Sequence, residues 1–188
     1  MLPPGLSFNC VSEKALAAQA RARLPKSYWA WAPMLAANRD GYFPSTPATN
    51  LLYGLRAALD MLLEEGLPRV FDRHARLAGA ARAAVSHWGL ELWCARSSEY
   101  SNTLTAVVMP ADFDEAELRG EILRRFDLSL GSGLGKLKGR VFRIGHLGDF
   151  NALSLIATLA GVEMGLAVCG VTHQAGGVNA AMSVLAKD

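Results

Sequence analysis

The sequence lacks the features that mark several common functional classes. Its 188 residues carry a formal net charge of only +2, an excess too small to predict a nucleic-acid or membrane-surface partner. The four histidines are scattered, and the three cysteines are far apart and odd in number, so neither set has the spacing of a metal site. We expect the cysteines to be free thiols in a reducing compartment; they are Cys10, Cys94 and Cys169.

The sequence also lacks a secretory signal and an obvious membrane span. No basic segment followed by an apolar one opens the chain. The longest apolar stretch, residues 151–170, contains Glu163 and several small residues, and it predicts a buried amphipathic helix. These absences favour a cytoplasmic protein without a membrane or nucleic-acid partner.

Hydrophobic residues make up 51% of the chain, and their periodicity divides it into two unlike parts. From residue 90 onward the pattern predicts strand, strand, helix, strand, strand, helix. This order is typical of an α+β layer in which helices cover one face of a small antiparallel sheet. Before it, residues 50–67 predict a helix with a wide apolar face, and Pro68 suits the first turn of a second helix.

The two ends of the chain predict less structure. The first 50 residues favour a short strand at 6–12, a helix capped by Ser12 and a long ordered loop at 25–49. These elements cannot bury a core together, so they are typical of the end of a larger domain. The residues after about 174 are small and polar, and we expect this tail to fray.

Arg143 is the strongest candidate for a binding residue. It stands between Phe142 and Ile144 in “GRVFRIGHLGDF”, residues 139–150, whose alternation predicts a strand. A buried guanidinium is costly unless an anion meets it, and its planar fork matches a carboxylate with two hydrogen bonds. The residues alone leave a structural ion pair and a carboxylate-binding site equally open.

Two neighbouring motifs favour structural roles. The stretch “GSGLGKLKG”, residues 131–139, lacks the first glycine and the final Ser or Thr of a phosphate-binding P-loop. It therefore predicts a flexible hairpin with exposed Lys136 and Lys138. His146 shares the strand phase of Ile144, which favours a buried structural histidine over a catalytic one.

Three stretches together resemble a known family. They are “MLPPGLSFNCVSEKAL”, “STPATNLLYGLRAALDMLLEEGL” and “LGSGLGKLKGRVFRIGHLGDFN”. In order and spacing they are similar to the C-terminal half of class V pyridoxal-phosphate (PLP) aminotransferases, closest to the serine–glyoxylate and alanine–glyoxylate group. The resemblance runs from residue 1 to about 170. It implies an α/β fold, namely the C-terminal portion of PLP-dependent transferase fold type I.

The resemblance also implies a division of the chain and an activity. Residues 1–49 would be a remnant of the large cofactor domain, 50–88 the bridging helices, 89–170 a small C-terminal α+β domain with a mostly antiparallel sheet, and 171–188 a tail. The complete protein would be a homodimer with a shared active site. It would use PLP to move an amino group from serine or alanine to glyoxylate.

Two site residues follow from the resemblance. In the family, the arginine of “RIG” binds the substrate carboxylate, and here this position is Arg143. The threonine of the “TP” turn reaches the PLP phosphate of the neighbouring subunit, and the matching position in “STPAT” is Thr46. Some members add a phosphate contact from a tyrosine just before this turn. Phe43 stands at that position here, with Tyr42 beside it.

The lysine that forms the Schiff base with PLP is the main departure from the family. It stands a few residues before the “PPG” turn, which here occupies residues 3–5, so the resemblance places it upstream of Met1. No catalytic residue is then expected in this chain. The lysine holds the cofactor and moves a proton, so we expect the chain alone to be inactive. The lysines present lie outside that motif: Lys14, Lys26, Lys136, Lys138 and Lys187.

Three interpretations stay open at this point. The chain is a piece of a working aminotransferase in which Met1 is an internal methionine. Alternatively, it is a non-catalytic interaction protein that pairs with a full-length subunit and retains a carboxylate-binding site. In the third interpretation the resemblance misleads, and Arg143 is structural.

Overall fold

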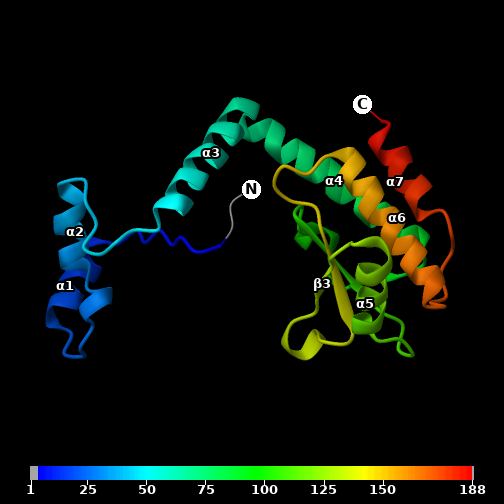
Figure 1. Cartoon of the computed structure of the whole chain (residues 1–188), viewed down its shortest axis with the longest axis horizontal. Helices are drawn as coiled ribbons and strands as arrows, with labels where there is room; N and C mark the ends of the chain where they lie inside the picture. Colours follow the sequence, from blue (N-terminus) through cyan, green and yellow to red (C-terminus); the bar gives the residue numbers. More distant parts are fainter. Residues whose placement is uncertain (1–3, 188) are drawn as a thin grey trace. The chain divides into compact units, whose positions relative to one another are not determined.

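The computed structural model describes residues 4–187, which form two compact units, 4–64 and 65–187 (Figure 1). The first unit contains the helices α1 (Glu13–Arg21) and α2 (Trp31–Arg39), the 3₁₀ turn Ser27–Trp29, and all of α3 (Thr49–Glu65) except its last residue, Glu65, which belongs to the second unit. Ser12 caps α1, as predicted, by accepting a hydrogen bond from the Ala15 N–H. Between residues 4 and 64, Ala58 is the one residue described as buried. This unit therefore has almost no core.

Two local predictions for the first unit are wrong. Residues 6–12 form no strand, because no strand of the described chain pairs with them and an isolated strand leaves its backbone groups unbonded. The segment expected to be a loop at 25–49 contains α2. Pro33 does not prevent this helix, because it lies in the first turn, where no backbone N–H has a partner within the helix.

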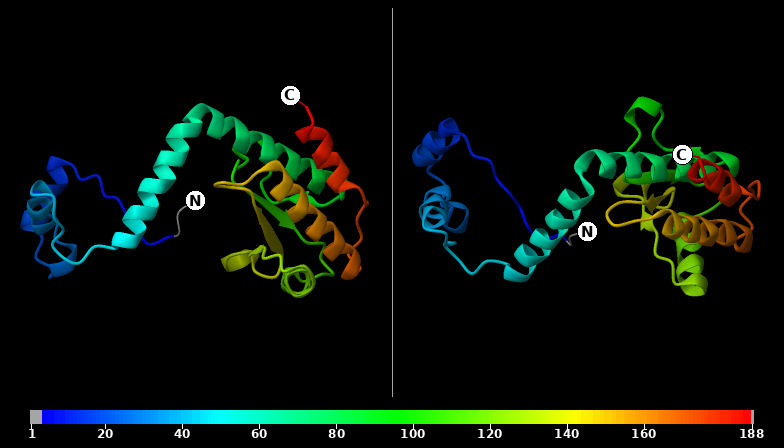
Figure 2. Two further views of the ribbon diagram at one scale, coloured as in Figure 1. Left: turned by 45° about the horizontal axis from the view of Figure 1, so that its top comes forward. Right: turned by 90° about the horizontal axis from the view of Figure 1, so that it is seen from above.

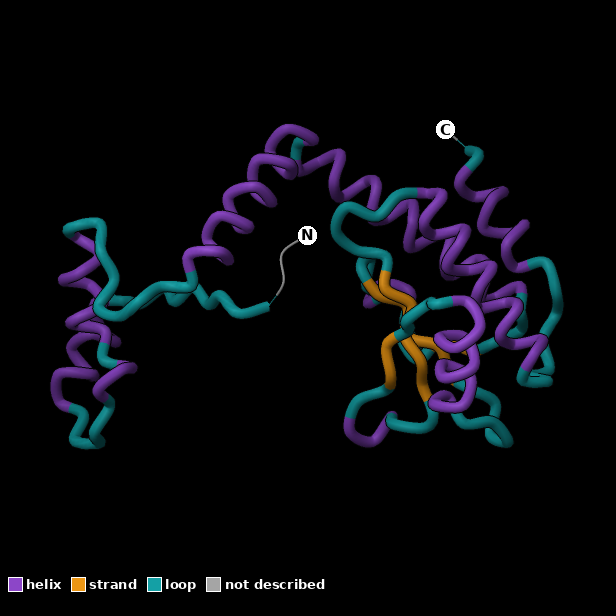
Figure 3. The backbone as a smooth tube through the Cα atoms, viewed as in Figure 1, coloured by secondary structure: helices purple, strands orange, loops and turns teal. Residues whose placement is uncertain are grey.

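The second unit alternates strands and helices in the predicted order. Its elements are α4 (Leu67–His87), β1 (Glu91–Leu92), a 3₁₀ turn (Ser97–Glu99), β2 (Leu104–Val108), α5 (Glu115–Phe126), β3 (Gly131–Ser132), a 3₁₀ turn (Gly135–Leu137), β4 (Val141–Gly145), α6 (Ala152–Val168) and α7 (Gly177–Leu185). The four strands form one antiparallel sheet in the order β1-β2-β4-β3. Figure 3 shows this small sheet in orange beside the helices. The predicted fold class, with its small antiparallel sheet, is confirmed.

The core of the second unit lies between one face of the sheet and the helices. Thr105 and Val107 of β2 and Phe142 and Ile144 of β4 are buried on this face. α4 packs on β1 and β2, and α5 packs on β3 and β4. α6 packs on α5 and α4 and contacts α7, so that α4, α6 and α7 lie together (Figure 2).

The expectation of a fraying tail is wrong, because residues 177–185 form α7. Ala181 and Leu185 are buried against α4 and α6. The carboxylate of Glu163 on α6 accepts hydrogen bonds from the Gly176 N–H at 2.6 Å, the Val178 N–H at 3.0 Å and the Trp88 indole at 2.9 Å. Although burial raises the pKa of Glu163, these hydrogen bonds outweigh it and hold the pKa below its usual value. The start of α7 is thus bonded to α6 through Glu163, whose carboxylate also bonds the Trp88 indole just after α4.

Candidate functional site

Arg143 lies on the sheet face opposite the core. Its neighbours Phe142 and Ile144 are fully buried, whereas Arg143 is partly exposed, because successive side chains of a strand point to opposite faces. It pairs with Ala106 of β2 on one side and with Gly131 of β3 on the other. The guanidinium is therefore outside the core, although its backbone is in a central strand.

The guanidinium of Arg143 makes one hydrogen bond to the described residues. Its Nε–H donates to the Ser132 carbonyl oxygen at 2.7 Å. Among residues 4–187, no carboxylate forms an ion pair with Arg143; the described ion pairs involve other arginines. The structure therefore does not supply the partner that a structural ion pair needs. The two Nη groups can donate to an incoming anion.

His146 lies three residues beyond Arg143, directly after the end of β4, and is buried on the core side of the sheet. Its Nε2 is 2.8 Å from the Thr105 hydroxyl, and its buried Nδ1 has no hydrogen-bond partner in the described part of the chain. Burial lowers the pKa of His146 to about 4, and the nearby positive charge of Arg82 acts in the same direction. The imidazole is therefore neutral at pH 7, in agreement with a structural role.

The loop that follows β4 is held by α4, a feature that the sequence did not reveal. Arg73 forms a two-bond ion pair with Glu65, at 2.6 and 2.8 Å, and donates to the carbonyl oxygens of Gly148 and Phe150 at 2.8 and 3.1 Å. The Gly148 N–H donates to Nε2 of His74 at 3.2 Å. The hydrogen bond to Glu65 raises the pKa of Arg73, and the same bond lowers the pKa of Glu65. These contacts fix the loop at the end of the strand that carries Arg143.

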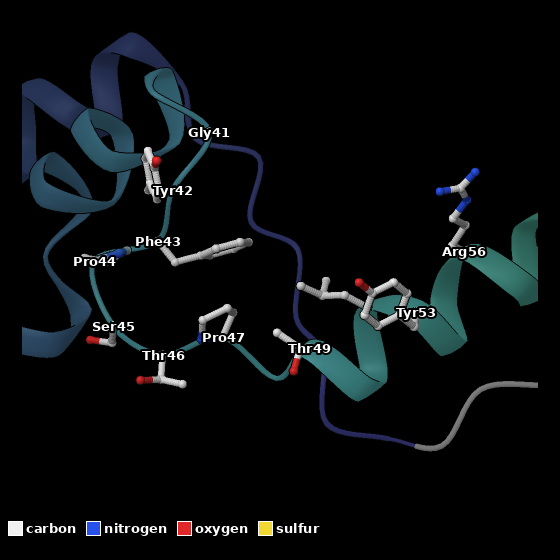
Figure 4. Close-up of a pocket in the computed structure, with 11 residues that line it drawn as sticks. Gly41, Tyr42, Phe43, Pro44, Ser45, Thr46, Pro47, Thr49, Tyr53 and Arg56 are labelled. Atoms are coloured by element: carbon white, nitrogen blue, oxygen red, sulfur yellow. The ribbon is translucent and has the colours of Figure 1, made fainter.

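Thr46 lies in the first unit, on the turn before α3. It lines an open cavity of about 860 Å³ together with Tyr42, Phe43, Tyr53 and other residues of 41–56. In Figure 4 the side chains of Thr46 and Phe43 leave the loop on different sides, and the Phe43 ring points toward α3. Thr46 is exposed, so its hydroxyl can donate to or accept from a group presented from outside this chain.

The cavity around Thr46 fits a phosphate contact but not a complete cofactor site. It offers the hydroxyls of Ser45, Thr46 and Thr49 and the guanidinium of Arg56. No lysine of residues 4–187 lines it. These groups could therefore hold a phosphate such as that of PLP, and no amine side chain lines the cavity within the described residues.

No helix within residues 4–187 combines the length and the apolarity that crossing a membrane requires. Nor do these residues gather three or more His, Cys, Asp or Glu side chains that could hold a metal ion.

Comparison with known proteins identifies the family. No family model matches the chain. It is 48% identical to the serine–glyoxylate aminotransferase of Methylorubrum extorquens over 98% of this chain and 48% of that protein. It is also 48% identical to the serine–glyoxylate aminotransferase of Arabidopsis thaliana, over 87% of this chain and 41% of that protein. The chain belongs to the class V aminotransferases.

The fold of this class V chain agrees with solved structures. The pyridoxamine–pyruvate aminotransferase of Mesorhizobium loti superposes with a TM-score of 0.83 at 36% identity, covering 93% of this chain and 46% of that one. The predicted family is confirmed, and related aminotransferases of this fold depend on PLP. The chain spans about half the length of the curated relatives it matches, with shares of 48% and 41%.

Proposed function

We propose that the 188 residues are the C-terminal half of a PLP-dependent aminotransferase that moves an amino group from serine or alanine to glyoxylate. One observation supports this most strongly: Arg143 is partly exposed, is fixed by the Ser132 carbonyl and has no ion-pair partner among residues 4–187. Glyoxylate, serine and alanine each carry the carboxylate that this fork matches. The names of the relatives support serine and glyoxylate among these substrates.

The residues of this chain would bind and orient the reactants. Arg143 would hold the carboxylate on a stiff strand, so that the reacting carbon is kept in one position. Thr46 would contribute a hydrogen bond to the phosphate of PLP bound in a neighbouring subunit of a homodimer. PLP, when bound, supplies the electron sink for amino transfer.

The chain alone would be inactive, because none of its lysines lies in the motif of the family's PLP-attaching lysine. The test is a hybrid enzyme in which residues 1–188 follow the preceding half of the M. extorquens enzyme. We expect the hybrid to transfer amino groups to glyoxylate and the purified chain not to. Turnover by the purified chain would contradict this part of the proposal.

Arg143 is tested in the same hybrid. Arg143→Ala should cost about 2–4 kcal/mol of substrate binding, which raises KM for glyoxylate about 30- to 1000-fold. Arg140→Ala, which removes an exposed arginine three residues away, is the matched control and should leave KM unchanged. Equal KM values for the two variants would reject the carboxylate role.

A second candidate function is that of a non-catalytic partner for a full-length subunit. The observation in its favour is the exposed apolar surface of the first unit: Phe8, Leu24, Tyr28, Trp29, Tyr42, Phe43 and Tyr53 are all at least 52% exposed. Side chains of this kind favour an interface. Co-purification of the chain with a full-length class V subunit would support this candidate, and a monomeric, unaccompanied chain would reject it.

A further inference from the structure

Gly131 lies directly opposite Arg143 in the pairing of β3 with β4. Its φ is not positive, so the backbone alone does not require glycine there. A Cβ added at Gly131 would lie 3.1 Å from Nε, 3.2 Å from Cβ and 3.4 Å from Cζ of Arg143. These distances are shorter than an ordinary contact of about 3.5–4.0 Å. The Arg143 side chain thus lies across the position where any other residue would have its Cβ.

The next residue of β3 determines which edge of the guanidinium stays available. Nε of Arg143 donates to the Ser132 carbonyl at 2.7 Å. A carboxylate can make two parallel hydrogen bonds either with Nε and one Nη or with both Nη groups. Since Nε is occupied, only the edge formed by the two Nη groups offers two donors.

The acceptor is itself held in place. Ser132 pairs with the fully buried Phe142. The loop that follows returns to α5, where the Gly139 N–H donates to the buried carboxylate of Glu115 at 3.3 Å and the Gly139 carbonyl accepts from the Glu115 N–H at 3.3 Å. The Ser132 carbonyl therefore belongs to a hairpin tied to the sheet at one end and to a helix at the other.

We propose that Gly131 is a positioning residue, which with the Ser132 carbonyl sets Arg143 for end-on binding of the substrate carboxylate through its two Nη groups. This inference rests on the proposed function of Arg143. This arrangement would raise the affinity for substrate by preorganisation. The Arg143 side chain is fixed before the substrate arrives, so it loses less conformational freedom on binding.

Two glycine substitutions form a matched pair. Gly131→Ala adds a methyl group against Arg143, whereas Gly120→Ala adds one on α5, where nothing apart from the backbone of the same helix lies within 4 Å of the new Cβ. In the hybrid enzyme we expect Gly131→Ala to raise KM for glyoxylate and serine about 10-fold with kcat within about twofold. Gly120→Ala should leave both constants unchanged.

The position of the Arg143 side chain can also be tested in the 188-residue chain itself, by a measurement that does not depend on enzymatic activity. In ¹⁵N NMR, the Nε–H of Arg143, assigned by its loss in Arg143→Lys, should exchange with water at least about 10-fold more slowly than the Nε–H of the exposed Arg140. Gly131→Ala should remove this protection, and Gly120→Ala should keep it. Exchange as fast as that of Arg140 in the unsubstituted chain would overturn the inference.

The kinetic outcomes separate this inference from the proposed function. If Arg143→Lys leaves KM unchanged in the hybrid, the carboxylate role fails and the positioning role fails with it. If Arg143→Lys raises KM but Gly131→Ala behaves like Gly120→Ala, the positioning role alone fails. A Gly131→Ala enzyme with a lower kcat and an unchanged KM would also overturn the inference. Such a result would mean that the substitution reduces the fraction of folded, active enzyme and leaves the substrate affinity as it was.

Discussion

The two units of this chain differ most in what they bury. In the second unit, Trp88 and Phe142 are 1% and 0% exposed. In the first unit, Trp29 and Tyr53 are both 75% exposed, although they are residues of the same kind. The second unit therefore has the core of an independent domain, whereas the first presents aromatic surface of the kind that another subunit or domain covers.

The two units also differ in whether they bury ionisable side chains. Glu115 and His146 of the second unit are both 0% exposed. Among residues 4–64, no ionisable side chain is buried. Changes of pH and changes of core volume should therefore act mainly on the second unit.

The largest effect that we expect comes from a matched pair of tryptophan substitutions. Trp88→Ala removes a fully buried ring and should lower the free energy of unfolding by about 3–5 kcal/mol. Trp29→Ala removes a ring that is 75% exposed and should change it by less than about 0.5 kcal/mol. Urea unfolding of the purified chain, followed by circular dichroism, measures both values.

A large decrease in the free energy of unfolding of Trp29→Ala would contradict this comparison. It would mean that the first unit buries Trp29 in solution, for example between two copies of the chain. The loss would then depend on protein concentration, because dissociation accompanies unfolding of an associated chain.

His146 should make the second unit sensitive to acid. Its pKa is about 4 in the folded chain against an ordinary value of 6.5, so the unfolded chain takes up a proton first as the pH falls. As the pH is lowered from 6.5 to 4, the free energy of unfolding should therefore decrease, and His146 should account for about 3 kcal/mol of the decrease. The measurement is the free energy of unfolding at several pH values for the unsubstituted chain and for His146→Gln, which cannot titrate. Parallel curves for the two proteins would show that His146 is not the cause.

The contrast between the units also explains which features the sequence could predict. β2 and β4 were predictable because their alternation reports burial on one face, and α5 was predictable from Asp114 before it and acids in its first turn. Arg143 stood out because its charge interrupts an apolar strand, while its role came from the family motif. Thr46 came from the motif alone, since an exposed hydroxyl on a loop carries no pattern.

The missed features depend on contacts between distant residues. Glu163 meets Trp88 across 75 residues of sequence and Gly176 across 13, so no local window could show that α7 would be held. Arg73 reaches Gly148 across 75 residues. Gly131 looked like part of a flexible hairpin, because its use becomes visible only when β3 pairs with β4.

The smallest effect that we expect concerns the attachment of α7. Glu163→Ala removes the acceptor of three hydrogen bonds and leaves the Trp88 indole and two backbone N–H groups without it. The free energy of unfolding should fall by about 2 kcal/mol, since unsatisfied donors are costly where water reaches them poorly. Glu117→Ala, which removes an exposed carboxylate from α5, is the control and should have little effect.

Hydrogen exchange adds a local measurement to this prediction. If Glu163 holds α7 as the structure indicates, the amides of Gly176 and Val178 should exchange faster in Glu163→Ala, while those of β2 and β4 keep most of their protection. Uniform acceleration across the second unit would instead mean that α7 and the sheet unfold together. In that case the helix that sequence reasoning expected to fray would be part of the cooperative core, and the boundary between core and periphery would lie beyond Leu185.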